Sequence, residues 1–234
     1  MKQDRSLFQT PFHGRYWALA AKEFASVRVL VIAAMLTALR IAVKAISIPV
    51  GPQLNVTFGF LVNSVASMIY GPVVAIVTSA VSDTLGAILF PSGPYFFPFI
   101  FVEIAGGLIF ALFYYRAKMT TLRIILGRFF VTLVCNLILN PIILFYYYQL
   151  ILGKSYTLYT LPRVIKNLVL FPAESVVLVI LFNAIIPVTN RFQLTYTGKT
   201  KLELQKKDII LLVIMTLISA AAIAGWLIYQ AHKA

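Results

Sequence analysis

Residues 29–48, VLVIAAMLTALRIAVKAISI, limit the possible folds most, because they are long enough to cross a bilayer yet contain Arg40 and Lys44. These two residues are four apart, so they share one face of a helix. A nearly opposite face carries small residues at the same spacing: Ala34, Ala38 and Ala42. Small residues let a second helix approach closely in lipid, whereas cations inside a span face a cavity, a ligand or a counter-ion. The stretch therefore predicts a membrane helix with one docking face and one binding face.

The composition indicates a membrane protein. Of the 234 residues, 61% are hydrophobic and 12% are charged, and long apolar runs recur along the chain. The net charge of +13 is compatible with nucleic-acid binding, but the basic residues flank the apolar runs, as the positive-inside rule predicts. We therefore expect the basic residues to lie beside a lipid bilayer, and we expect no nucleic acid as a partner of this chain. The single cysteine, Cys135, lies within a predicted span and forms no internal disulfide.

The apolar runs predict six spans and a candidate seventh. The predicted spans are 29–48, two within 57–90 that are separated at Gly71-Pro72, and then 96–115, 124–149, 164–188 and 208–230. The chain divides accordingly into a basic N-terminal tail (1–26), a six-helix membrane domain (27–190), a linker (191–207) and an extra transmembrane helix (208–234). In the tail, Phe12, Tyr16 and Trp17 fit either a short interfacial helix or a loosely ordered segment.

The distribution of basic residues predicts the orientation. The tail through Arg28 holds five Lys or Arg residues, the segment 116–128 holds four and the segment 191–207 holds five. If spans alternate, these three segments share one side of the membrane, and the other side has only four basic residues. The positive-inside rule then places the N-terminus, the basic tail and the linker in the cytoplasm.

Several polar residues share one depth in the predicted spans. Each lies about seven to ten residues from the outer end of its span, or roughly 10–15 Å. They are Arg40, Asp83, Glu103, Asn140 and Glu174. A common depth predicts one polar cavity that opens outward. A simpler interpretation, compatible with the first, is that Arg40 and Lys44 pair with Asp83 and with Glu103 or Glu174.

Aromatic residues and amides near the outer surface allow two interpretations each. One aromatic group fits an interfacial belt or a platform for stacking a ligand: Tyr95, Phe96, Phe97, Phe99 and Tyr146 to Tyr148. Asn136 and Asn140 fit hydrogen bonding between helices. Arg163 and Lys166 fit a ligand anion or lipid headgroups.

Three stretches resemble a known family. LTALRIAVKAISIPVGPQLNVTFGFL, IYGPVVAIVTSAVSDTLGAILFPSGPYFFPF and LPRVIKNLVLFPAESVVL are similar to the folate-type substrate-binding S components of energy-coupling factor (ECF) transporters. The resemblance covers about residues 27–190. It implies an all-α membrane bundle of six helices, in which Ala34 and Ala38 match the AxxxA docking motif. Two features depart from the family: Glu103 stands where a small or hydroxyl residue is expected, and the run 208–230 adds a seventh helix.

The resemblance also implies a function, the high-affinity binding of a vitamin in an outward-facing pocket. For folate, Asp83 and Glu103 would accept hydrogen bonds from the pterin, and the cations would hold the glutamate carboxylates. The positive end of the helix that starts after Pro162 would assist. The full set of candidate binding residues is Arg40, Lys44, Asp83, Glu103, Asn140, Arg163, Lys166 and Glu174. Docking on a coupling subunit would fall to Ala34, Ala38 and Ala42.

The expected partners are a transmembrane coupling subunit and two ATPase subunits in a bacterial cell membrane. The chain contains no GxxxxGK[ST] motif, so ATP would be hydrolysed by the partners, and we expect no cofactor or metal on this chain. Other interpretations stay open at this stage: an S component for pantothenate or a pyrimidine, a secondary carrier, a structural membrane protein, or an intramembrane enzyme. The two histidines, His13 and His232, are terminal, so an enzyme would have to use a carboxylate pair.

Overall fold

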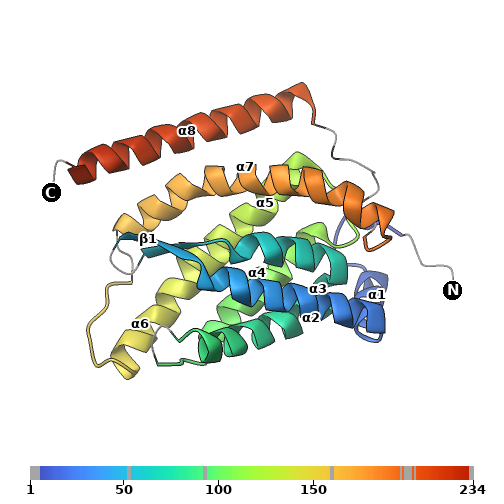
Figure 1. The fold of residues 1–234 in the computed structure, drawn as a ribbon, viewed down its shortest axis with the longest axis horizontal. Helices are drawn as coiled ribbons and strands as arrows, with labels where there is room; N and C mark the ends of the chain where they lie inside the picture. The colour runs from blue at the N-terminus through green and yellow to red at the C-terminus, as the bar shows by residue number, and fades with distance from the viewer. Residues whose placement is uncertain are drawn as a thin grey trace.

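The computed structural model describes residues 6–51, 54–91, 94–158, 161–195, 197, 202 and 204–231. It is a helical bundle with one small hairpin, which agrees with the predicted all-α membrane fold (Figure 1). The elements are α1 (Gly14–Phe24), α2 (Val27–Ala45), β1 (Ser47–Gly51), β2 (Leu54–Thr57), α3 (Gly59–Leu89), α4 (Phe99–Tyr114), α5 (Thr121–Val131), the π-helix η1 (Thr132–Leu139), α6 (Asn140–Leu150), α7 (Leu161–Arg191) and α8 (Lys206–Ala231). β1 and β2 pair antiparallel in the predicted loop 49–57, with Ser47 opposite Thr57.

Element α3 consists of two helical segments, 59–70 and 72–89, that meet at Gly71. Gly71 has φ 76° and ψ −178°, a conformation that is essentially restricted to glycine. Asn63 and Ser79 would be about 24 Å apart along one straight helix. Yet a Cβ on Gly107 of α4 would lie within 4 Å of both side chains. The chain therefore reverses direction at Gly71, and the predicted break between two spans is confirmed.

Other helices also match the predicted spans. By length and apolar composition, Thr121–Leu150 and Arg163–Arg191 are each able to cross a membrane, and Gly59–Leu89 passes the same test only if its two segments are counted as one helix. Helices α1 and α2 pass the same test together, across an 80° bend, and α4 is a shorter apolar helix. The stretch Thr121–Leu150 joins α5, η1 and α6 into one long helix. Pro141, which has no N–H to donate to the preceding turn, is the second residue after the π-helical η1.

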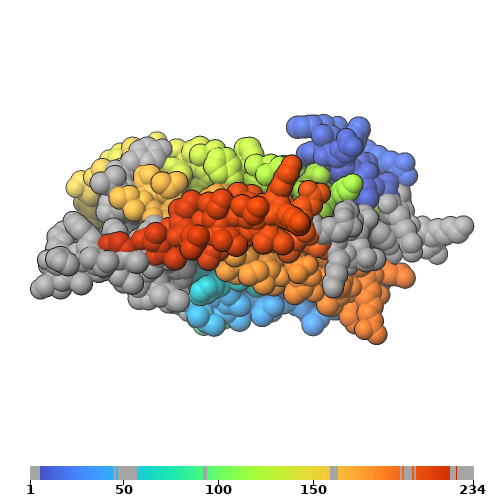
Figure 2. Space-filling view, turned by 90° about the horizontal axis from the view of Figure 1, so that it is seen from above, coloured from blue at the N-terminus to red at the C-terminus, as the bar shows by residue number. Residues whose placement is uncertain are grey.

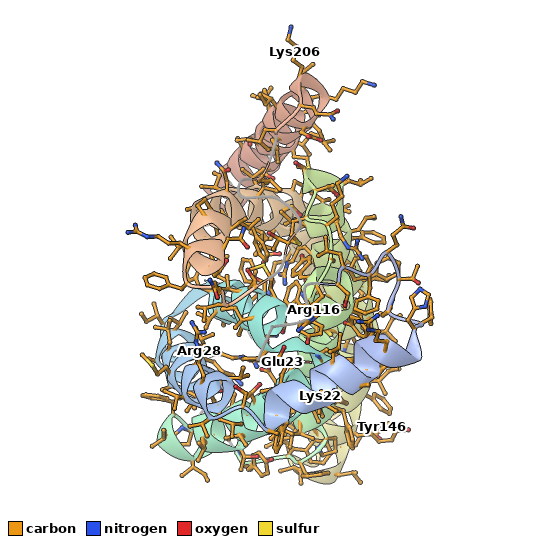
Figure 3. All side chains as sticks on the ribbon, turned by 90° about the vertical axis from the view of Figure 1, so that its right-hand side faces the viewer. Lys22, Glu23, Arg28, Arg116, Tyr146 and Lys206 are labelled. Atoms are coloured by element: carbon orange, nitrogen blue, oxygen red, sulfur yellow. The ribbon has the colours of Figure 1, made fainter. Side chains whose placement is uncertain are left out.

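The described parts of the three basic segments lie at one end of the bundle, which we call the basic end (Figures 1 and 3). Backbone hydrogen bonds join them there, from Phe8 N to Arg116 O (2.9 Å) and from Met119 N to Thr197 O (3.3 Å). Glu23 of α1 pairs with Arg116 of the turn after α4 at 3.2 Å. The β1–β2 hairpin lies at the opposite end, the hairpin end (Figure 1). The described parts of these segments therefore lie together as predicted, except for Arg128, which lies in the cavity wall; Lys2, Arg5, Lys199 and Lys201 fall outside the described residues.

The N-terminal tail contains a helix, one of the two interpretations that the sequence allowed. Tyr16 of α1 is buried, and its hydroxyl donates a hydrogen bond to the carbonyl of Ala111 at 3.0 Å. Phe12, which precedes α1, and Trp17 are exposed. Helix α1 is therefore anchored to α4 through Tyr16 and also carries an exposed aromatic ring, Trp17.

An apolar core closes the half of the bundle nearer the basic end. It includes Met68, Phe110, Tyr114, Ile124 and Phe182, all almost completely buried. The Tyr114 hydroxyl donates to the carbonyl of Ile124 at 2.7 Å, so its polar atom is satisfied inside the core. The cavity described below lies on the other side of this core, toward the hairpin end.

Helix α8 lies along α7 on one face of the bundle (Figures 1 and 2). Met215 and Ser219 are buried, and the Ser219 hydroxyl donates to the carbonyl of Val169 at 3.4 Å. Ile210 and Leu217 are exposed. The predicted extra helix is therefore present and packed on the bundle, and its crossing of the membrane stays a prediction.

Substitution of Gly71 by alanine will destabilise the protein. The new Cβ would lie 3.0 Å from the ring of Tyr115, in a backbone conformation that side chains disfavour. We expect a loss of about 2–5 kcal/mol from strain and overpacking, measured by denaturant unfolding in detergent. Gly153→Ala is the control, because Gly153 also has a positive φ but no atom within 4 Å of its Cβ position. An equal, small effect of both substitutions would show that the contact with Tyr115 is unimportant.

Candidate functional site

A polar cavity of about 360 Å³ lies between α2, α3, α4, the α5–α6 helix and α7, on the hairpin side of the apolar core. Seven of the eight predicted binding residues line it: Arg40, Lys44, Glu103, Asn140, Arg163, Lys166 and Glu174. The eighth, Asp83, lies behind Lys44 and does not belong to the lining. Four of the five polar residues that share a depth along the sequence thus lie on one cavity.

An ion-pair network joins α2, α3 and α4 on one wall. The guanidinium of Arg40 contacts the Glu103 carboxylate and donates to the Ser79 hydroxyl at 3.1 Å. The ammonium of Lys44 lies 3.0 Å from Glu103 Oε1 and 3.3 Å from Asp83 Oδ1. The predicted pairing of these four charges is therefore present in the same structure as the cavity. Glu103 takes part in both pairs, so it holds α4 against α2.

Glu174 pairs with Arg128, so Glu103 is the one of the two alternative carboxylates that pairs with Arg40 and Lys44. Arg128 Nε lies 3.0 Å from Glu174 Oε2, and its guanidinium carbon lies 4.3 Å from the ring centre of Phe60. The sequence count had assigned Arg128 to a cytoplasmic segment. It is instead buried in the cavity wall, because α5 begins at Thr121 and places Arg128 two turns inside the helix. Thr120, a helix N-cap residue that accepts a hydrogen bond from Arg123 N, was the sequence signal for this earlier start.

The first turns of α7 supply two further cations, Arg163 and Lys166. The carbonyl of Arg163 accepts a hydrogen bond from Asn167 Nδ2 at 2.9 Å, and Asn167 Oδ1 accepts one from Asn136 Nδ2 at 3.1 Å. Asn136 therefore does connect two helices, as one interpretation predicted, while Asn140 lines the cavity one turn further on. These bonds fix the start of α7 against η1 and hold both cations at the hairpin end of the cavity.

The predicted aromatic group lies outside the cavity lining. Phe96, Phe99 and Tyr147 contact one another, with ring centres 5.7–6.1 Å apart. Tyr95 and Phe97 are exposed at the hairpin end. This arrangement favours the interfacial belt over the stacking platform. The described aromatic residues that do line the cavity are Phe60 and Phe110, which the sequence reasoning missed.

The described cavity wall has an excess of positive charge. Five cations line it, Arg40, Lys44, Arg128, Arg163 and Lys166, against the carboxylates of Glu103 and Glu174. With Asp83 behind Lys44 as a third carboxylate, two positive charges remain. In a low-dielectric site these charges attract a dianion strongly. In the described part of the chain, no group of three or more His, Cys, Asp or Glu residues is arranged to hold a metal ion.

The Arg128–Glu174 pair gives a test of the site's construction. Arg128→Leu or Glu174→Leu alone leaves one buried charge without its partner, and each is expected to lower the free energy of unfolding by about 3–5 kcal/mol. The double variant removes both charges and should regain most of the loss. The measurement is a double-mutant cycle by denaturant unfolding in detergent. Losses that simply add in the double variant would show that the two side chains do not interact.

Known proteins resemble the chain in sequence and in structure. Residues 28–182 match the family described as "ECF transporter, substrate-specific component". The folate transporter FolT of Clostridium novyi (strain NT) is 32% identical over 127 residues, 54% of this chain and 72% of that protein. FolT of Leuconostoc mesenteroides is 31% identical over 149 residues, 63% of this chain and 80% of that protein.

A crystal structure of FolT bound with folic acid superimposes with a TM-score of 0.56 and 29% sequence identity, covering 64% of this chain and 89% of that chain. The resemblance inferred from the three sequence stretches is therefore confirmed, and it extends to the fold. The chain belongs to the family of substrate-specific components of ECF transporters.

Proposed function

We propose that this chain binds folate in its cavity and delivers it as the S component of an ECF importer. The observation that carries the proposal is the cavity's charge, an excess of two cations over the described carboxylates. Folate carries two carboxylates on its glutamate and a planar pterin. The relatives that match the chain are folate transporters, and the similar solved structure binds folic acid. A volume of about 360 Å³ also suits a small organic ligand.

The distribution of groups along the cavity suggests the orientation of the ligand. Arg163 and Lys166 lie at the start of α7, near the hairpin end, and are placed to hold the glutamate carboxylates by charge-assisted hydrogen bonds. The deeper wall offers Phe60, Phe110 and the carboxylate of Glu103, which suit a flat ring with N–H donors. In this proposal Asp83 acts indirectly, by holding Lys44 in the wall.

The exposed side of α2 supports the docking role of its alanines. Ala34, Ala38 and Ala42 line a shallow apolar groove of about 620 Å³ between α2 and the 72–89 segment of α3. Arg40, on the opposite side of the same helix, is buried in the cavity wall. We propose that the coupling subunit docks in this groove and that ATP is hydrolysed by two partner ATPase subunits. The basic end then faces the cytoplasmic side of the cell membrane. When the bundle tilts in the membrane, the loaded cavity turns toward the cytoplasm.

Titration of the purified protein with folate tests the binding function. We expect one-to-one binding, weakened at least about tenfold by Arg163→Gln, because the variant loses a charged hydrogen bond to a ligand carboxylate. The loss should be much smaller for pterin-6-carboxylate, which lacks the glutamate. Isothermal titration calorimetry measures both ligands. Heat with pantothenate or a pyrimidine in place of folate would keep the transport role and overturn the folate assignment.

A bulky side chain in the groove should uncouple binding from transport. Ala34→Trp or Ala38→Trp fills the space that a partner helix would occupy, so uptake by the assembled complex should fall to background while the folate Kd stays within about twofold. Ile180→Trp, at an exposed position on α7, is the matched control and should transport normally. Transport at the parental rate in both alanine variants would exclude this groove as the docking surface.

A further inference from the structure

The helix that forms one wall of the cavity changes its hydrogen bonding where it passes the cavity. Element η1 is π-helical, so its N–H groups donate five residues back instead of four. At its end, the N–H of Asn140 donates to the carbonyl of Cys135, and the next residue is Pro141, which has no N–H. π-Helical turns inside α-helices are uncommon and frequently occur at functional sites. This turn is therefore a candidate part of the binding site.

The change of hydrogen bonding leaves one main-chain oxygen without a donor from its own helix. In an α-helix the carbonyl of Asn136 would accept from the N–H of Asn140, four residues further on. That N–H instead bonds to Cys135. The π-helical pattern would supply a donor five residues further on, but that residue is Pro141, which has none. Neither pattern therefore supplies a donor to the Asn136 carbonyl within this described helix.

The Asn136 carbonyl lies on the side of the helix that faces the cavity. Asn136 and Asn140 both line the cavity, and both remain partly exposed. Because helical carbonyls point along the axis toward the C-terminus, the oxygen of Asn136 lies between these two residues. The side chain of Asn136 is fixed at the wall, since its Nδ2 donates to Asn167 Oδ1 at 3.1 Å. A main-chain acceptor without a helical donor is tolerated inside a membrane bundle where it lines a cavity.

Asn136 occupies the middle level of the cavity. Arg128, eight residues earlier in the same long helix, pairs with Glu174 in the deeper part. Asn167, the partner of Asn136, lies one turn after Arg163 at the start of α7. The carbonyl therefore lies between the deeper wall proposed to hold the pterin and the cations proposed to hold the glutamate. In folate this position belongs to the aminobenzoyl linker, which carries an N–H donor at each end.

We propose that the main-chain carbonyl of Asn136 accepts a hydrogen bond from the ligand, and that Pro141 is the positioning residue that keeps this carbonyl available. The proposal rests on the proposed function and assigns the carbonyl to an N–H of the folate linker. The carboxylates of the cavity lining, Glu103 and Glu174, are paired with arginine or lysine, so a ligand donor has to compete for them. The Asn136 carbonyl gives up no helical donor, so a hydrogen bond formed there adds to the affinity for the ligand.

Substitution of Pro141 by alanine tests this role, because it restores a main-chain N–H. If the turn stays π-helical, the new N–H donates to the Asn136 carbonyl, and if it becomes α-helical, the N–H of Asn140 does so. Either way the carbonyl is lost to the ligand. We expect Pro141→Ala to weaken folate binding about tenfold, and to change the binding of pterin-6-carboxylate, which lacks the linker, by less than about twofold. Isothermal titration calorimetry measures both affinities.

The stability of the empty protein should move in the opposite direction to the folate affinity. Proline is unfavourable inside a helix, and in Pro141→Ala a main-chain carbonyl gains a partner. The thermal midpoint in detergent should therefore stay the same or rise. A purely structural role for Pro141 predicts instead that the midpoint and both affinities fall together.

Pro187→Ala is the matched control. Pro187 also lies inside a long apolar helix, α7, but it does not belong to the described cavity lining. This variant gains a main-chain N–H in the same way and should leave both affinities unchanged. If Pro141→Ala does not fold, Pro141→Leu restores the same N–H and puts a larger side chain at this buried position.

Two results would overturn the assignment of the Asn136 carbonyl while leaving the proposed function intact. One is an unchanged folate affinity in a folded variant of Pro141. The other is an equal loss for folate and pterin-6-carboxylate, which would indicate that Pro141 only shapes the cavity as a whole. If the parent protein does not bind folate, the proposed function itself fails, and the assignment fails with it.

Discussion

The network of Arg40, Lys44, Glu103 and Asp83 is the interaction on which the rest of the structure depends. A cation inside a membrane bundle is tolerated only when it faces a partner or a polar cavity. Glu103 satisfies both cations of α2 at once, so α2, the 72–89 segment of α3 and α4 can pack together only in the arrangement that brings these charges into contact. Glu103 is therefore a structural requirement of this chain, because Arg40 and Lys44 both rely on it.

Helix α2 connects this network to the surface of the bundle. Its four-residue spacing places Ala34 and Ala38 in an exposed groove and Arg40 in the cavity wall, two residues from Ala38. A rigid helix that reaches both places transmits any displacement from one to the other. In the proposed transport cycle, events at the groove and at the cavity would then be coupled through one element, with no need for a long pathway of intermediate side chains.

The sequence predicted those features that depend on local spacing. The two faces of α2, the reversal at Gly71 and the common depth of the polar residues all follow from helix geometry and from glycine and proline chemistry. It did not predict features that depend on how helices rotate against one another. Arg128 was misplaced because it was counted with the basic segment 116–128 although it also falls within the predicted span 124–149, and its pairing with Glu174 required knowledge of how α5 faces α7. Phe60 and Phe110 were missed for the same reason, since an isolated span does not show which of its sides faces a cavity.

The excess of two positive charges in the cavity bears on how a loaded bundle would move. Reorientation of a site within a bilayer is opposed by every charge that it keeps uncompensated, because the surrounding lipid solvates charge poorly. The described cavity wall carries five cations against three carboxylates when Asp83 is included, and a bound dianion such as folate would balance this net charge. Under the proposed function, the ligand therefore lowers the electrostatic barrier to tilting. Binding and inward delivery would then be linked by charge neutralisation, which favours movement of the loaded S component over the empty one.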